Sequence, residues 1–61
     1  MAWSRDDKHD EAVRELRYRR RVYARLITEG KMRQEDADRR ISIMEAIADD
    51  YAPADLFGTA R

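Results

Sequence analysis

Residues 26–36 read Leu-Ile-Thr-Glu-Gly-Lys-Met-Arg-Gln-Glu-Asp, and this stretch decides the fold because one helical pattern ends in it and another begins. Gly30 stands where the residue after a helix adopts the left-handed conformation, and Lys31 follows it. Acidic residues then gather in 35–38, where the dipole of a starting helix favours anions. Because so short a connection, 30–33, makes its two helices antiparallel neighbours, the sequence predicts an all-α fold, an antiparallel two-helix hairpin.

The first helix is predicted over about residues 10–29, where apolar residues recur at helical spacing. Its start is open between two alternatives. Ser4 and Asp7 fit a capping box that would begin the helix near Arg5, whereas an N-terminal arm would occupy residues 1–9. The residues that share its apolar stripe are Ala12, Val13, Leu16, Tyr23, Leu26 and Ile27, with Val22 at the edge.

The second helix is predicted over about residues 34–51, and its apolar residues repeat with a coiled-coil-like spacing. Ile47 widens the stripe and Ile43 falls outside it. We expect the helix to stop before Pro53, because the residue that precedes a proline avoids the α conformation. The hairpin then spans residues 10–52 and residues 53–61 form a C-terminal tail. The seam itself consists of Ala37, Ile41, Met44, Ala48 and Tyr51.

Charge is divided between the two helices. Residues 14–25 carry six arginines against one glutamate, and residues 34–55 carry seven acids against two arginines. The hairpin register therefore predicts that Arg20 reaches Glu45. It predicts in the same way that Arg17 or Arg19 reaches Asp49. Such exposed pairs contribute only ~0–1 kcal/mol each, so their expected role is to select the register.

The composition points to a second chain. The 61 residues include no cysteine and one histidine, which excludes disulfides and thiolate zinc sites as staples for a domain of this size. Two helices cannot enclose a core, so we expect a homodimer that forms a four-helix bundle, or docking on another protein. The residues expected at this oligomer or partner interface are Leu16, Tyr23, Ile41, Ile43, Met44, Ile47 and Tyr51.

Enzymatic chemistry has little support in the sequence. No nucleophile elbow, phosphate-binding loop or dinucleotide motif occurs, so we predict no catalytic residue, no cofactor and no metal site. The acidic cluster around His9 is better explained as the start of a helix than as a metal site. No apolar run reaches membrane-spanning length and no signal peptide is recognisable, so we expect a cytoplasmic protein that does not enter membranes.

Four arginines at helical spacing form a basic side of the first helix, with Tyr18 beside them. One interpretation is a DNA- or RNA-binding surface in which the arginines contact phosphates and the tyrosine stacks on a base. The other is a solvated helix side partly neutralised by acids of the second helix, which the zero net charge favours. The four residues are Arg14, Arg17, Arg21 and Arg25.

The chain resembles a family of small helical-hairpin proteins found in alphaproteobacterial phages and prophages. The resemblance covers about residues 11–51 and is carried by Glu15-Leu16, Arg19-Arg20, Val22-Tyr23, Leu26-Ile27, Gly30-Lys31-Met32, Ala37, Ile41, Ile43-Met44-Glu45-Ala46-Ile47-Ala48 and Asp50-Tyr51. It implies a phage accessory protein that acts on a host or phage macromolecule in the bacterial host cell. From the helical pattern and the missing catalytic motifs, we expect a non-enzymatic interaction or regulatory module. Family members often carry Thr or Ser at the cap of the second helix, where this chain has Arg33.

The tail resembles the short peptide by which bacterial replication and repair proteins dock on the DNA polymerase sliding clamp. Its last four positions, Ala, Asp, Leu and Phe, match Ala54, Asp55, Leu56 and Phe57, while Pro53 stands where the motif has Gln. The adjacent apolar side chains of Leu56 and Phe57 need cover, either from a partner's pocket or from the helices of the hairpin. The resemblance implies a host DNA-replication protein as partner.

Overall fold

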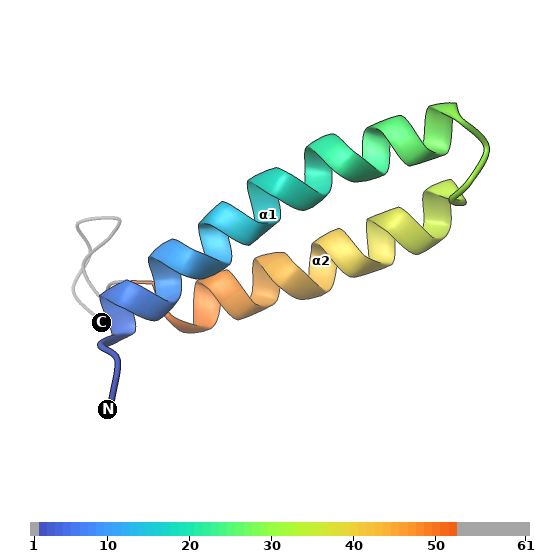
Figure 1. The fold of residues 1–61 in the computed structure, drawn as a ribbon. Helices are drawn as coiled ribbons and strands as arrows, with labels where there is room; N and C mark the ends of the chain where they lie inside the picture. The colour runs from blue at the N-terminus through green and yellow to red at the C-terminus, as the bar shows by residue number, and fades with distance from the viewer. Residues whose placement is uncertain (1, 53–61) are drawn as a thin grey trace.

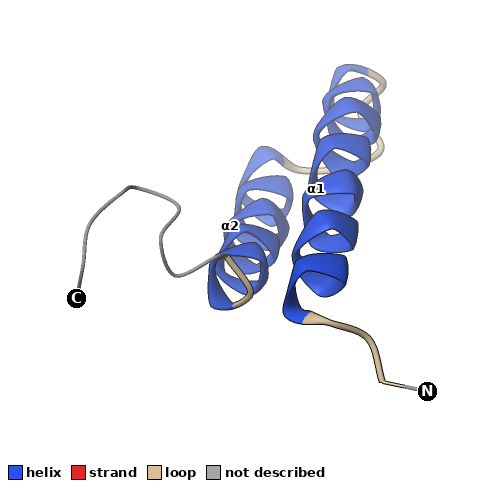
Figure 2. Cartoon of the chain, turned by 90° about the vertical axis from the view of Figure 1, so that its left-hand side faces the viewer, coloured by secondary structure: helices blue, strands red, loops and turns tan. Residues whose placement is uncertain are grey.

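Two antiparallel helices and the turn between them make up the fold of residues 2–52. The computed structural model describes residues 2–52, with α1 at Arg5–Thr28 and α2 at Gln34–Asp50. The two ribbons run side by side in both views (Figures 1 and 2), and residues 2–52 contain no strand. The predicted all-α hairpin is therefore confirmed.

The start of α1 is fixed by a capping box. The Asp7 N–H donates to Ser4 Oγ at 3.0 Å, and the Ser4 N–H donates to Asp7 Oδ2 at 3.4 Å. These reciprocal bonds satisfy backbone donors that the first helical turn leaves without partners. The early start at Arg5 is confirmed, and the alternative of an arm over residues 1–9 is wrong.

Gly30, which the sequence predicts at the end of the first helix, lies in the turn that ends α1. Gly30 has a φ of +73°, which is the left-handed region. Its N–H donates to the Ile27 carbonyl at 3.0 Å, and the Lys31 N–H donates to the Leu26 carbonyl at 2.8 Å. These two bonds define a Schellman motif, which satisfies carbonyls at the end of the helix and reverses the chain.

The start of α2 is capped less well. Arg33 holds the N-cap position with an extended backbone, and its side chain accepts no hydrogen bond there because arginine has no acceptor atom. Glu35 and Asp36 lie in the first turn, where the helix dipole stabilises them. The helix ends at Asp50, and Tyr51 forms its C-cap.

The core between the helices is small. Its central cluster contains Leu16 and Met44 as the only large members, together with alanines, and Val13 and Ile41 pack against it. No described side chain is completely buried. A fully buried large apolar side chain contributes about 1.5–3 kcal/mol, so this core supplies few such contributions. The buried apolar residues are Ala12, Leu16, Ala37, Met44 and Ala48.

Candidate interaction surfaces

One side of the hairpin carries apolar residues that the described chain leaves uncovered. On α2, Ile43 is 45% exposed and Ile47 is 40% exposed, and the two lie one helical turn apart. On α1, Val22 and Leu26 are half-buried and also lie one turn apart. We call these four residues, Val22, Leu26, Ile43 and Ile47, the isoleucine face.

Helical geometry places the four residues on the same side of the molecule. Arg19 of α1 and Met44 of α2 line one surface hollow, which marks the side that both helices share. Val22 follows Arg19 by three residues, and Ile47 follows Met44 by three residues. Because residues three or four apart are neighbours on a helix surface, the isoleucine face continues that side along both helices.

The residues expected at a partner interface fall into different environments. Leu16 and Met44 are buried between α1 and α2, so the hairpin itself covers them. Tyr23, Ile41 and Tyr51 are half-buried, while both isoleucines of α2 remain exposed. Of the set predicted from sequence, these two isoleucines offer the largest uncovered apolar side chains.

A groove opens on the opposite side of the hairpin, in the half nearest the turn. It has a volume of about 440 Å³, and the two ribbons diverge toward the turn in Figure 1. Tyr23 and Ile27 of α1 and Ala37 and Ile41 of α2 line it. Sequence periodicity does not reveal this groove, because the groove depends on how far the helices spread. Its polar margin consists of Arg20, Thr28, Gln34 and Asp38.

An ion pair joins the two helices as predicted. The Arg20 guanidinium donates to the Glu45 carboxylate. Both side chains are about half exposed, at 53% and 47%. The Arg20 side chain therefore extends to solvent, and its charge is not buried between α1 and α2.

The second predicted ion pair is not formed. Arg19 Nε instead donates to Glu15 Oε2 at 2.8 Å, one turn earlier on the same helix, and this bond raises the pKa of Arg19 above its ordinary value. Among residues 2–52, neither Arg17 nor Arg19 pairs with Asp49. Glu15 lies four residues before Arg19 on the same helix, where side chains are neighbours. This pair forms without any contact between the helices and replaces the predicted pair with Asp49.

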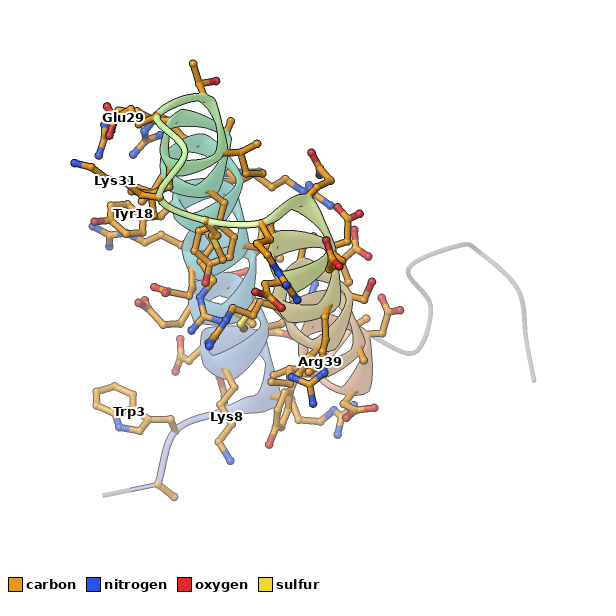
Figure 3. The ribbon with its side chains drawn as sticks, turned by 90° about the vertical axis from the view of Figure 1, so that its right-hand side faces the viewer. Trp3, Lys8, Tyr18, Glu29, Lys31 and Arg39 are labelled. Carbon is orange, nitrogen blue, oxygen red and sulfur yellow. The ribbon has the colours of Figure 1, made fainter. Side chains whose placement is uncertain are left out.

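The four arginines predicted as possible nucleic-acid contacts, Arg14, Arg17, Arg21 and Arg25, are all exposed on α1; we call them the arginine row. Within residues 2–52 none of them has an acidic partner. Tyr18 is 53% exposed, and the Arg21 guanidinium lies 5.7 Å from the centre of its ring. In Figure 3, Tyr18 lies on the side of α1 that is turned away from α2.

Among the N-terminal acids, Asp7 belongs to the helix cap, and Asp6 lies beside it in the first turn. Asp7 completes the capping box, and His9 Nδ1 lies 3.6 Å from Asp10 Oδ1. Residues 2–52 contain no group of three or more histidine, cysteine, aspartate or glutamate side chains that could hold a metal ion. In the same part of the chain, neither helix has the length and apolar character needed to cross a membrane.

The predicted docking peptide of the tail, Ala54, Asp55, Leu56 and Phe57, lies outside the described residues. No protein-family model, curated protein or solved structure matches the chain. Within residues 2–52, the isoleucine face presents exposed apolar side chains, and the arginine row presents arginines without acidic partners.

Proposed function

We propose that the protein is a non-enzymatic interaction module that pairs with a second copy of itself through the isoleucine face and so forms a four-helix bundle. The proposal rests on a contrast within residues 2–52: two isoleucines of α2 are exposed, while Leu16 and Met44 are the only large side chains that are buried. Covering such side chains stabilises a fold by about 1.5–3 kcal/mol each. Dimerisation thus supplies the burial that one hairpin lacks.

A second copy suits this face because a two-fold axis sets the same patch against itself. Val22 and Leu26 of one chain can then cover Ile43 and Ile47 of the other. At the α1 margin of the face, Glu15 and Arg19 already neutralise each other. Apolar residues at the centre with paired charges at the margin are typical of stable interfaces.

The proposed cellular role is that of a phage-type accessory protein in a bacterial host cell. In this proposal the dimer presents two copies of the tail, and Ala54–Phe57 docks on the sliding clamp of host DNA replication. Two linked copies of a weak peptide bind a multivalent partner more tightly than one copy does, because the second contact forms at a high effective concentration. Dimerisation would therefore serve the docking.

The test compares two double variants of α2 that add the same charge. Ile43→Glu with Ile47→Glu places two carboxylates in the isoleucine face, whereas Ser42→Glu with Ala46→Glu places them at neighbouring exposed positions outside it. We expect the first variant to sediment as a monomer and the second to remain a dimer. Glutamate favours helix more than isoleucine does, so a loss of association would not reflect poorer helix formation.

Thermal unfolding gives an independent readout. A dimer melts at a higher temperature as its concentration rises, because association stabilises only the folded chains. We expect this shift in circular dichroism for the wild type and not for the isoleucine variant. A wild-type monomer with full helicity and a sharp melt at micromolar concentration would contradict the proposal.

A further inference from the structure

Among residues 2–52, the arginine row is set apart from the other arginines of α1 because its members bind neither an acidic side chain nor α2. Arg5 donates to the Asp50 carbonyl at 2.5 Å, Arg19 pairs with Glu15, and Arg20 pairs with Glu45. Each of these bonds uses an arginine that lies toward α2 or at its flank. The members of the row have no acidic partner within residues 2–52. The acidic residues of α2 therefore do not neutralise the arginine row, and this side of α1 stays positively charged.

The row is linear and its charge is concentrated. From Arg14 to Arg25 the helix rises about 16 Å, at about 1.5 Å per residue. Residues 16–28 contain no acidic residue. Arg14 lines a hollow with Asp7 and with other acids of the first turns, so the other three arginines form the most positive part. A rigid line of this kind suits a ligand whose negative charges also repeat along a line.

We propose that this side of α1 binds single-stranded nucleic acid, with phosphates on the arginine row and a base stacked on Tyr18. Arginine guanidiniums bind phosphate oxygens through two parallel hydrogen bonds. An exposed aromatic ring next to such a row supplies the stacking surface that binders of single strands use. An acidic protein would not need that ring, and a membrane would need an apolar stripe that this side of the helix lacks.

The binding test uses fluorescence anisotropy with a labelled oligothymidylate of about 20 nucleotides, which exceeds the footprint of one row. We expect one phosphate contact for each of the four arginines. A plot of the logarithm of the association constant against the logarithm of the salt concentration should then have a slope of about −2.8. Arg17→Gln with Arg21→Gln should make the slope shallower by about 1.4 and weaken binding. The matched control removes the same charge from exposed arginines of α2, Arg39→Gln with Arg40→Gln, and should leave both quantities nearly unchanged.

Substitutions of Tyr18 distinguish the contribution of base stacking to the affinity from that of the arginine charges. Tyr18→Ala should weaken binding roughly 5- to 150-fold, the range found when one stacked aromatic is removed, without changing the salt slope. Tyr18→Phe keeps the ring and should bind like the wild type. Because Tyr18 is 53% exposed, neither substitution should alter the circular dichroism of the hairpin.

Three results would overturn the proposal. The first is an absence of binding to the single strand at about 50 mM salt, where phosphate contacts are strong. The second is an equal loss in the α1 and α2 arginine variants, which would indicate unspecific attraction. The third is tighter binding to phosphatidylserine vesicles or polyglutamate than to the strand, with no effect of Tyr18→Ala. The row lies outside the isoleucine face, so Ile43→Glu with Ile47→Glu should retain binding per chain, and the two proposals can fail separately.

Discussion

Arg20 and Glu45 form an ion pair that connects α1 to α2, although 25 positions separate them in the sequence. The pair is half exposed, so solvent screens it and it contributes only about 0–1 kcal/mol. We expect Glu45→Gln to lower the free energy of unfolding by less than about 1 kcal/mol, measured by urea denaturation followed by circular dichroism.

Exchanging the two charges tests whether the pair selects the register. Arg20→Glu alone should destabilise the hairpin more than Glu45→Gln, because it sets two acids against each other. Adding Glu45→Arg should recover most of that loss. A loss of several kcal/mol for Glu45→Gln would instead show that the pair is desolvated.

Gly30 is predicted to resist substitution for conformational reasons alone. Its φ is +73°, and a Cβ at this position would meet no atom within 4 Å. Gly30→Ala should therefore cost about 1–2 kcal/mol, the penalty of the left-handed conformation for a residue with a side chain. Gly30→Asn should cost less, because asparagine tolerates that conformation. Equal costs for the two variants in urea denaturation would contradict this explanation.

Substitutions at the two N-cap residues, Ser4 and Arg33, should change the stability of the hairpin in opposite directions. Ser4→Ala removes the capping box of α1 and should cost about 0.5–2 kcal/mol. Arg33→Ser supplies α2 with a cap that it lacks and should stabilise the hairpin by about 0.5–1 kcal/mol. The exposed contacts of Arg33 with Glu35 and Asp36, at 3.7 and 3.6 Å, contribute too little to reverse the gain. Thermal melting at one fixed protein concentration checks both signs, and destabilisation by Arg33→Ser would contradict the second.

If the tail is a docking peptide, changes in it should affect binding to the sliding clamp and not the stability of the hairpin. Deleting residues 55–61 should leave the melting temperature unchanged and abolish binding to a purified bacterial sliding clamp, measured by surface plasmon resonance. Leu56→Ala with Phe57→Ala should have the same effect, because the adjacent apolar pair would fill the partner's pocket. A truncated chain that unfolds at lower temperature would mean that the tail stabilises the hairpin instead.

Features with local causes could be predicted from the sequence. Gly30 ends α1 because its neighbours in the chain supply both Schellman bonds, and Ser4 starts α1 because Asp7 lies three residues away. The register followed from the length of the turn, and Arg20 meets Glu45 as that register requires. Even here the sequence left the start of α1 open, since the strength of a cap does not exclude a frayed end.

Features that depend on packing could not be predicted in the same way. Periodicity placed Leu16, Leu26 and Ile47 on apolar stripes, but it does not say how much of a wide stripe one neighbouring helix covers. The hairpin buries Leu16 and leaves Ile47 40% exposed. The partner of Arg19 also depended on a competition between Asp49 across the hairpin and Glu15 on the same helix, which only side-chain positions decide.

Trp3 is the one tryptophan of the chain, and it stands 64% exposed before the first turn of α1, directed away from α2 (Figure 3). Its fluorescence therefore reports water in the folded hairpin as well as in the unfolded chain. An unfolding curve recorded at this chromophore would be nearly flat while the helical signal collapses. Agreement between probes is the usual criterion for two-state unfolding, and here their disagreement would carry no information about an intermediate.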